Sequence, residues 1–483
     1  MTDTTPDELD QVLDDAVAAA AVLRGRSPSE RAGWLRAAAD ALDGAAERLL
    51  PLAQEESRLP LPRLTGELKR TTFQLRLFAD EIAAGAYLHA TIDHADPGWG
   101  MGPRPDLRRM QLPLGPVAVW AASNFPFAFS VAGGDTASAL AAGCPVVLVA
   151  HPGHPRLSRA TAEVLIAALE GAGAPQGVFA LVEGQETGRT LITDPRITAG
   201  AFTGSLRGGR ALFDLASGRE TPIPFYGELG SVNPAFVTAA ASAARAEEVA
   251  AGFAGSMALG VGQFCTKPGL LFVPADSPIP GLVAERLQEV AGAPMLNDRI
   301  REGYGQALTA LASHEVVEVL AGSADPSGDP APTLLRTSAA EILADPRPLT
   351  AEVFGPAALV VEYTDDEELL AAARTLEGQL TATVQGEPDD QVAPALLEVL
   401  SERAGRVLWG GWPTGVSVTY AQQHGGPYPA TTAVGTTSVG TAAIERFLRP
   451  VAYQDLPEAL LPEPLQDANP WHVPQRIDGT QHS

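Results

Sequence analysis

A cysteine in a glycine-flanked segment is the residue of this sequence best suited to covalent chemistry. Cys265 lies between Gly262 and Gly269, and Cys144 is the only other cysteine among the 483 residues. Glycines let the backbone turn sharply and approach a ligand closely. A thiolate is a strong nucleophile near neutral pH, although the thiol must first lose its proton. A lone cysteine is more commonly a small buried hydrophobe, so the role of Cys265 depends on its neighbours.

Regular elements on both sides would hold the Cys265 segment in place. Residues 242–257 have the composition of a helix, and residues 269–273 form an apolar run that is typical of a strand. The thiol would then lie in a loop, where side chains are commonly presented to ligands. Cys144 precedes a proline at the start of another apolar run, which favours a buried structural residue.

The charge and the apolar pattern exclude several classes of protein. A formal charge of −25 argues against binding to nucleic acid or to an anionic membrane surface. No apolar run is long enough to span a bilayer, and no basic segment followed by an apolar one opens the sequence, so we expect a cytoplasmic protein. The two cysteines cannot form a disulfide framework and lack metal-ligand spacing, so no metal is predicted.

Helices are predicted to dominate the first 90 residues. Thr5 with Glu8, and Ser27 with Glu30, each form a capping box with a proline at the first helical position. A third helix is predicted for residues 64–84. Residues 94–105 are rich in Pro, Gly and Asp, which is typical of a linker, and residues 108–114 have an extended pattern.

From residue 116, apolar runs alternate with helical segments, which is the pattern of a parallel sheet covered on both faces. The predicted strands are residues 117–122, 145–150, 178–182 and 199–202, and the predicted helices are residues 131–142 and 158–169. Because crossovers between parallel strands are right-handed, this pattern predicts an α/β, doubly wound parallel-sheet domain of the nucleotide-binding type.

A second alternation follows residue 234 and predicts a second α/β domain. Helices are predicted at 242–257, 279–291 and 298–312, and strands at 269–273, near 334, and at 358–362, 380–384 and 406–409. The proline-rich tail beyond Tyr453 is predicted to be an arm that lies on a neighbouring surface or subunit.

Five segments, taken together and in this order, resemble the aldehyde dehydrogenase superfamily. They are residues 123–126 (SNFP), 202–205 (FTGS), 228–230 (ELG), 262–265 (GQFC) and 352–356 (EVFGP). Other segments resemble the bacterial branch of that superfamily that prefers NADP and acts on fatty aldehydes and α-ketoglutaric semialdehyde. They are residues 104–109, 132–138, 424–429 and 449–455.

The resemblance implies NAD(P)-dependent oxidation of an aldehyde to a carboxylate. Cys265 would attack the aldehyde to form a hemithioacetal, and Asn124 with the Cys265 backbone N–H would stabilise its oxyanion. Glu228 would activate the water that hydrolyses the later thioester, and could take the thiol proton earlier. His424 would lie on the substrate side of the thiol, although a loop histidine without a role is an open alternative. Taken singly, Asn124 could be a turn residue and Glu228 a surface carboxylate.

The resemblance also implies a nicotinamide cofactor site. The residues assigned to it are Ser123, Phe125, Gly204, Ser205, Glu352 and Phe354. Gly204 and Ser205 would begin a helix whose N-terminal amides face a pyrophosphate, Glu352 would hold the nicotinamide ribose, and Phe354 would pack beside the ring. Val149 stands where the family has a lysine that reaches the adenosine ribose. The cofactor, NADP or NAD, and its affinity are therefore open.

The implied architecture has three parts. Residues 1–92 and 116–230 would form the cofactor-binding domain, residues 231–437 the catalytic domain, and residues 93–115 and 438–483 the bridging segments of a homodimer or homotetramer. Two rival hypotheses stay open. The chain could be an aldehyde dehydrogenase-like protein that has lost cofactor use and serves in binding or assembly. It could also be an esterase or thioesterase that keeps only the acyl chemistry.

Overall fold

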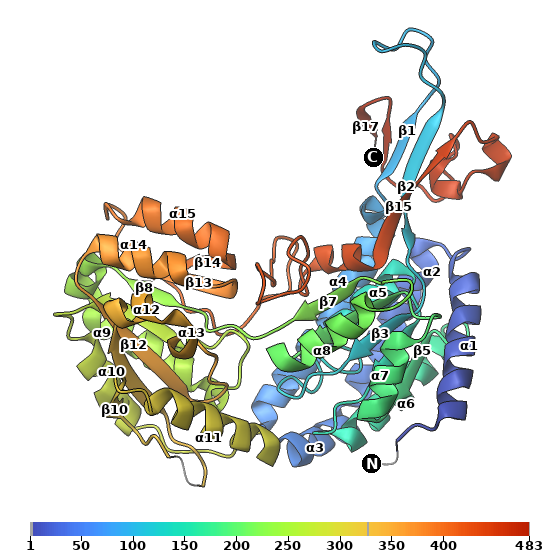
Figure 1. Cartoon of the computed structure of the whole chain (residues 1–483). Helices are drawn as coiled ribbons and strands as arrows, with labels where there is room; N and C mark the ends of the chain where they lie inside the picture. The colour runs from blue at the N-terminus through green and yellow to red at the C-terminus, as the bar shows by residue number, and fades with distance from the viewer. Residues whose placement is uncertain (1–2, 326–327, 483) are drawn as a thin grey trace.

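The computed structural model describes residues 3–325 and 328–482 and contains three β-sheets. Figure 1 shows two lobes side by side, each built around one sheet, and a narrow arm of strands that projects from one of them. Both lobes combine parallel strands with covering helices, so the predicted α/β class is confirmed.

The sheet of the first lobe has five parallel strands in the order β5-β4-β3-β6-β7. The strands are β3 (Val117–Trp120), β4 (Val146–Val149), β5 (Phe179–Val182), β6 (Ala199–Thr203) and β7 (Phe225–Glu228). The connecting helices are α5 (Gly134–Ala142), α6 (Pro155–Gly171), α7 (Gln185–Thr193) and α8 (Leu206–Ser217). The strand order reverses between β3 and β6, and in such sheets ligands bind at the carboxyl ends of the strands beside the reversal.

Four N-terminal helices cover the first lobe. They are α1 (Pro6–Leu23), α2 (Pro28–Gly44), α3 (Ala46–Ser57) and α4 (Leu61–Ala84). Both predicted capping boxes form, at Thr5 and at Ser27. Helix α3 was not predicted, because it follows α2 after a single residue, has no capping side chain and contains Pro51. These helices pack into the same core as α5 and α6.

The sheet of the second lobe has seven strands in the order β10-β11-β12-β9-β8-β13-β14, and only the β10–β11 pair is antiparallel. The strands are β8 (Ala235–Val237), β9 (Leu270–Pro274), β10 (Glu318–Ala321), β11 (Thr333–Ser338), β12 (Ala357–Tyr363), β13 (Gln379–Gln385) and β14 (Ala404–Trp409). The helices are α9 (Ala239–Ala258), α10 (Ile279–Gln288), α11 (Asp298–Ala312), α12 (Ala339–Ala344), α13 (Pro346–Leu349), α14 (Asp366–Thr375) and α15 (Ala393–Arg403). Two hydrophobic clusters fill the two faces of this sheet.

The arm is a third sheet in the order β15-β2-β1-β16-β17. Its strands are β1 (Ala90–Asp93), β2 (Leu107–Pro113), β15 (Leu448–Gln454), β16 (Gln475–Ile477) and β17 (Thr480–His482). The predicted linker at residues 94–105 closes on itself through a bridge between Asp96 and Arg104. The C-terminal tail pairs with β1 and β2 of its own chain, so the two bridging segments of the sequence form one structure.

Several element boundaries differ from the sequence prediction. Helix α5 begins at Gly134 instead of residue 131, and α10 ends at Gln288 instead of residue 291. Strand β8 and helix α7 were not predicted, because they are only 3 and 9 residues long and carry weak periodicity. In the described part of the chain, no helix combines the length and apolarity needed to cross a membrane.

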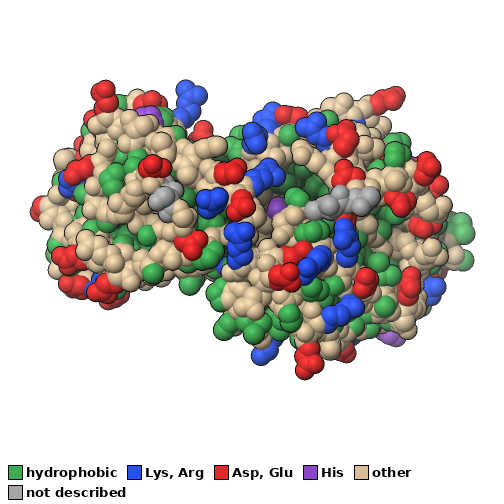
Figure 2. Space-filling view, turned by 90° about the horizontal axis from the view of Figure 1, so that it is seen from below, with side chains coloured by type: hydrophobic (Ala, Val, Ile, Leu, Met, Phe, Trp, Pro, Cys, Tyr) green, Lys and Arg blue, Asp and Glu red, His purple; other side chains and the backbone are tan. Residues whose placement is uncertain are grey.

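Charge is unevenly distributed over the surface. On the face shown in Figure 2, acidic side chains are spread over both lobes, whereas Lys and Arg side chains gather near the junction between them. The formal charge of the whole chain is −25. The positive charge on this face is therefore concentrated where the two lobes meet.

Candidate active site

The loop that carries Cys265 turns tightly through a short 3-10 helix, η2 (Leu259–Gly262), after α9. Gly262 has a left-handed φ of 63°, and a Cβ placed on it would lie 2.2 Å from the carbonyl oxygen of Gly355. Only glycine fits such an approach between two backbones. The predicted need for Gly262 is therefore confirmed, and the loop packs directly against the segment that precedes β12.

Asn233 fixes the other side of the loop. Its side-chain amide donates hydrogen bonds to the carbonyl oxygens of Cys265, at 2.8 Å, and Lys267, at 3.0 Å. Asn233 itself has a φ of 48°, a conformation that asparagine tolerates better than most residues. The sequence analysis placed only the start of the second alternation here, so this anchor of the cysteine loop was missed.

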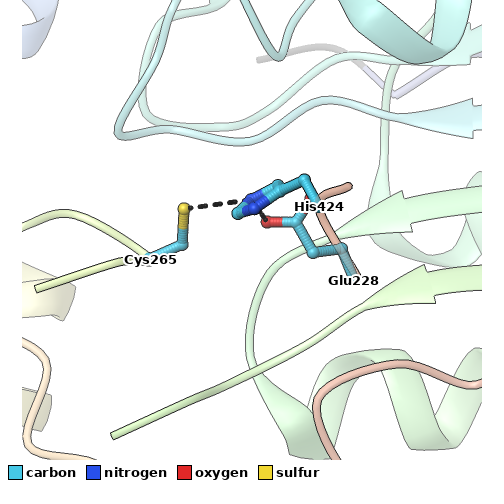
Figure 3. A group of neighbouring side chains, drawn as sticks. All are labelled: Glu228, Cys265 and His424. Carbon is cyan, nitrogen blue, oxygen red and sulfur yellow. Dashed lines mark hydrogen bonds and ion pairs between the residues drawn. The ribbon is translucent and has the colours of Figure 1, made fainter. Parts of the chain in front are cut away.

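Figure 3 shows Cys265, His424 and Glu228 converging from three separate segments. Nε2 of His424 lies 3.6 Å from Sγ of Cys265 and 2.9 Å from Oε1 of Glu228. Glu228 ends strand β7, and His424 lies in the loop between β14 and β15. The hydroxyl of Ser438 donates a hydrogen bond to the second carboxylate oxygen of Glu228. One imidazole nitrogen therefore faces both the thiol and the carboxylate.

The surroundings of this group raise one pKa and lower another. Burial, followed by the negative charges of Glu228 and Glu352, raises the pKa of the Cys265 thiol well above its usual range, and Arg70 opposes this effect. Burial on its own would also raise the pKa of Glu228. The charge of His424 and the hydrogen bonds from His424 and Ser438 outweigh burial and hold the pKa of Glu228 below its usual value. The group thus pairs a protonated thiol with an ionised carboxylate.

Asn124 lies beside the cysteine loop. It follows β3, and its side-chain amide donates a hydrogen bond of 3.2 Å to the carbonyl oxygen of Gln263. The guanidinium of Arg63 donates to the Asn124 carbonyl oxygen at 2.7 Å, which holds the backbone from the other side. The structure therefore places Asn124 against the loop that carries Cys265.

The same three side chains satisfy the spacing of a metal-ligand set. One ligand atom from each of Glu228, Cys265 and His424 lies within 4.8 Å of the others. The sequence could not indicate this arrangement, because the three residues are far apart along the chain. Their hydrogen bonding and charge are equally consistent with acid–base chemistry around a nucleophilic thiol.

Comparison with known proteins establishes the family. The model of the aldehyde dehydrogenase family matches residues 1–450. The chain belongs to the aldehyde dehydrogenase family. It is similar to α-ketoglutaric semialdehyde dehydrogenase 2 of Azospirillum brasilense, with 46% identity over 465 residues that cover 94% of this chain and 88% of the relative. It is also similar to the α-ketoglutaric semialdehyde dehydrogenase of Acinetobacter baylyi, with 42% identity covering 98% and 91% of the two chains.

Solved structures show the same fold. The structure of 3,6-anhydro-L-galactose dehydrogenase in complex with NAP has a TM-score of 0.79 at 21% identity, covering 94% of this chain and 92% of that chain. Aldehyde dehydrogenase 21 from Physcomitrella patens, in complex with the reaction product succinate, has a TM-score of 0.79 at 20% identity, covering 93% of this chain and 91% of that chain.

The family match and the sequence relatives show that the present chain is an oxidoreductase that oxidises an aldehyde with NAD(P). The binding-protein and esterase alternatives are not favoured.

The aldehyde dehydrogenase has a helix terminus suited to a dinucleotide. Ser205 is the N-cap of α8 and accepts a hydrogen bond from the backbone N–H of Gly208. Gly204 and Ser205 are exposed at the carboxyl end of β6, so the backbone N–H groups of the first helical turn face outward. Such N–H groups, together with the helix dipole, stabilise a pyrophosphate. The predicted helix start is confirmed, and the donor set fits the cofactor that the family uses.

Glu352 lies in the segment that precedes β12 of the second lobe. A Cβ on Gly230 would lie 2.4 Å from a carboxylate oxygen of Glu352, so the carboxylate reaches the turn that follows Glu228. Burial raises the pKa of Glu352 to about 7, against the opposing charge of Lys267. Lys267 is buried, and its ammonium donates to the carbonyl oxygens of Val353, at 2.9 Å, and Ala357. Phe354, also predicted at the cofactor, lies half-buried in this same segment.

Two other predicted cofactor residues adjoin Asn124. Ser123 is half-buried in the loop after β3. The ring of Phe125 packs edge-on against Phe264 at 5.3 Å and against Phe129 at 5.4 Å. Phe125 thus contributes an aromatic wall beside the cysteine loop, and its assignment to the cofactor stays a prediction.

Val149 ends strand β4 and is buried in an apolar cluster with residues of α1. Gly188 of α7 and Trp120 of β3 also adjoin it. Arg156, Arg207 and Arg210 are the arginines expected to be able to replace the missing lysine. Of these, Arg156 pairs with Glu55, and Arg210 pairs with Asp214. Both guanidiniums are therefore already engaged by carboxylates of the protein.

Proposed function

We propose that Cys265 is the nucleophile of this aldehyde dehydrogenase, that Glu228 and His424 control its proton, and that Asn124 stabilises the oxyanion. The observation that supports this proposal most strongly is the contact of one imidazole nitrogen with both groups. Nε2 of His424 lies 3.6 Å from the Cys265 sulfur and 2.9 Å from the Glu228 carboxylate. A nucleophile and a base held within hydrogen-bonding reach of a third group is the usual arrangement in covalent catalysis.

The resting proton arrangement follows from donor chemistry. An ionised carboxylate only accepts hydrogen bonds, so Nε2 of His424 must carry the proton that it shares with Glu228. The thiol therefore cannot give its proton to Nε2 while that nitrogen is protonated. Glu228 takes the S–H proton and becomes a carboxylic acid, and Nε2–H of His424 then turns its hydrogen bond to the Cys265 thiolate. Because the thiol pKa is high, little thiolate is present at rest, and the proton transfer to Glu228 is drawn forward when the thiolate reacts with substrate.

The thiolate attacks the aldehyde carbon, and the C–S bond forms as the carbonyl π electrons move to oxygen. The side-chain amide of Asn124 and the backbone N–H of Cys265 donate to this oxyanion. One donor of this kind typically lowers the barrier by about 3 kcal/mol. Arg63 donates a hydrogen bond of 2.7 Å to the backbone carbonyl oxygen of Asn124 and so keeps this residue in position. Because the side-chain amide is already ordered, substrate binding does not have to order it.

A bound nicotinamide cofactor would supply the hydride acceptor that oxidation of the tetrahedral carbon requires. The product of that step on the protein is a thioester at Cys265. Glu228 first releases the thiol proton to solvent. Ionised again and held by Ser438 and His424, it then accepts a proton from water as the water attacks the thioester carbon. The C–S bond then breaks, the carboxylate product leaves, and the sulfur is reprotonated.

The cofactor would be held by residues from both lobes. The amides at the start of α8 would bind the pyrophosphate, Glu352 would bind the nicotinamide ribose, and Phe354 would pack beside the ring. Ser123 and Phe125 would complete the contact from the loop after β3. Because Val149 replaces a cationic side chain at the carboxyl end of β4, we expect weak binding and little preference for NADP over NAD.

The assembly would follow the division of the chain. Residues 1–92 and 116–230 would form the cofactor-binding domain, residues 231–437 the catalytic domain, and residues 93–115 and 438–483 the oligomerisation segments. The projecting arm in Figure 1 leaves edge strands β15 and β17 open for pairing with another copy. A homodimer or homotetramer is therefore the expected state.

A single-turnover experiment on Glu228→Gln tests this function. Without its carboxylate the enzyme should produce a fast burst of reduced cofactor and then stall, because the thioester persists without an activated water. The imidazole of His424, no longer bound to an anion, can accept the thiol proton in the place of Glu228. Steady-state turnover at the wild-type rate would show that Glu228 has no part in hydrolysis.

A further inference from the structure

A buried lysine lies two residues after the proposed nucleophile. Lys267 is one of only two lysines in the chain, and it is 4% exposed, whereas the other, Lys69, is exposed on α4. A buried ammonium group keeps its charge only where hydrogen bonds and an opposite charge offset the loss of water. No step assigned to Cys265 uses Lys267, so another role has to account for its burial.

The ammonium of Lys267 bridges the two ends of the turn that precedes strand β12. It donates hydrogen bonds to the carbonyl oxygen of Val353, at 2.9 Å, and to that of Ala357, at 2.7 Å. Phe354, which is expected to pack beside the nicotinamide ring, lies in the turn between these two residues. An apolar side chain at position 267 would remove both hydrogen bonds and leave the turn without this support.

The same turn is in contact with the backbone of the cysteine loop. The carbonyl oxygen of Gly355 would lie 2.2 Å from a Cβ placed on Gly262. At the other end of the loop, Asn233 donates a hydrogen bond of 3.0 Å to the carbonyl oxygen of Lys267. Lys267 is thus anchored in the cysteine loop by its backbone, and its side chain holds residues 352–357 against that loop.

Lys267 and Glu352 also act on each other through their charges. Burial raises the pKa of Glu352 and lowers the pKa of Lys267, and the charge of each group opposes the effect of burial on the other. Within the described residues no ion pair joins the two groups, and a small cavity beside them is lined by both side chains together with Ser231 and Val232. The negative charge of Glu352 also acts on Cys265, whose thiol pKa it raises. Lys267 therefore favours the ionised form of Glu352.

We propose that Lys267 is a positioning residue for the cofactor, which fixes residues 352–357 on the cysteine loop and supplies the positive charge that balances Glu352. This inference rests on the proposed role of Glu352 at the nicotinamide ribose. Both oxygens of an ionised carboxylate accept hydrogen bonds from hydroxyl groups, whereas a protonated carboxyl group has to find an acceptor for its own O–H. Lys267 affects cofactor binding only through Glu352 and the turn.

The dissociation constant for NAD, measured by calorimetry over a range of pH, tests the inference. Without the ammonium, burial acts on Glu352 unopposed, so its pKa rises further and more of it is protonated at neutral pH. Lys267→Met should therefore raise the dissociation constant by about tenfold near pH 7, the effect of a shift of about one pKa unit. The difference from the wild type should narrow as the pH rises, because Glu352 ionises in the variant while Lys267, with a pKa of about 8, loses its charge in the wild type.

Two further variants separate charge from structure. Lys69→Met removes the only other lysine, which is exposed on α4, and should leave the dissociation constant unchanged at every pH. Lys267→Gln keeps an N–H donor and loses the charge, so it should show the same pH-dependent loss as Lys267→Met. It also replaces the methionine variant if that variant does not fold. A loss that stays equal at every pH would show that Lys267 supports the turn without acting on Glu352, and would overturn the inference.

A double-mutant cycle distinguishes the inference from the proposed function. Glu352→Gln should itself weaken the binding of NAD, and Lys267→Met added to it should have little further effect, because the carboxylate on which the charge acts is gone. Equal losses from Lys267→Met in both backgrounds, or wild-type affinity in Lys267→Met near neutral pH, would overturn the inference alone. Wild-type affinity in Glu352→Gln would instead contradict the proposed role of Glu352, and the inference with it.

Discussion

The two cysteines of this chain lie at opposite ends of parallel strands: Cys144 at an amino end, and Cys265 in a loop beside carboxyl ends. Cys144 stands at the amino end of β4, fully buried, with its sulfur 3.4 Å from the carbonyl oxygen of Phe447. Cys265 stands in a loop that faces the carboxyl ends of β3 and β7 in the other lobe, where Asn124 and Glu228 emerge. Both thiols have raised pKa values, and burial is the first cause in each case.

The difference lies in the groups that can act on each thiol. In the part of the chain that the structure describes, no carboxylate or imidazole forms a hydrogen bond with Cys144. Burial outweighs the nearby charge of Arg31, so the raised pKa of Cys144, about 11, keeps this thiol protonated. At Cys265 a carboxylate, an imidazole and an amide converge, so the same proton can be removed and the resulting charge can be stabilised. Burial alone thus makes an inert thiol, and burial beside a base makes a nucleophile.

The largest contrast between the two cysteines should appear on substitution. Cys265→Ser should lower aldehyde oxidation below about one hundredth of the wild-type rate, because an alcohol is far harder to ionise than a thiol. Cys144→Ala should keep most of the activity, because only a weak S–H hydrogen bond is lost. Initial rates with a saturating aldehyde measure both. Substantial activity in the serine variant would mean that another nucleophile carries the reaction.

Removing the imidazole should make the Cys265 region resemble the Cys144 region. His424→Gln should lower kcat/KM by about 100-fold, the usual contribution of one acid–base group, and should slow the burst as well as the steady state. His314→Gln, a substitution after α11 and away from the thiol, is the control. An effect on KM alone would assign His424 to substrate binding and separate it from proton control.

Strand β4 has Cys144 at its amino end and Val149 at its carboxyl end, where the cofactor is expected to bind. Val149→Lys would place an ammonium at this edge, where a charge-assisted hydrogen bond to a ribose or phosphate contributes about 1.5–3 kcal/mol. We expect dissociation constants about 10- to 100-fold lower, most of all for NADP, measured by calorimetry. The buried cluster around Val149 makes some loss of thermal stability the expected cost. No gain in affinity would indicate that a different donor already serves the cofactor.

The smallest effect should be seen in thiol reactivity. Both thiols have pKa values above the ordinary range, so alkylation by iodoacetamide should quicken as the pH rises and more thiolate forms. Glu228→Gln removes a negative charge that raises the pKa of Cys265, so alkylation of Cys265 at a fixed neutral pH should become several-fold to about tenfold faster. Cys144, away from Glu228, should react at an unchanged rate. Peptide mapping distinguishes the two cysteines.

Part of this site could be predicted from the sequence. The parallel sheets followed from fully apolar runs such as residues 145–150, and the capped helix starts at Thr5 and Ser27 followed from side-chain chemistry that acts within four residues. The roles of Cys265 and Glu228 came from family resemblance, because nothing in their spacing brings them together. Their arrangement depends on how the two lobes pack together, and a local sequence pattern does not indicate that packing.

The residues that support the site were the ones missed. Ser438 lies 210 positions from the carboxylate to which it donates, and Asn233 lies 32 positions from the backbone oxygen of Cys265. Arg63 and Arg70 have the spacing of an ordinary helix face, and only the fold shows that this face meets the aromatic wall of the cysteine loop. Long-range polar contacts of this kind leave no periodic signal in the sequence.

The covalent adduct itself provides the most direct test of the central claim. Glu228→Gln should be mixed with cofactor and a saturating aldehyde, quenched after one turnover, digested, and mapped by mass spectrometry. The account predicts an acyl group on the peptide that contains Cys265 and none on the peptide that contains Cys144, in an amount equal to the burst of reduced cofactor. Reduced cofactor formed without any acyl group on Cys265 would contradict it.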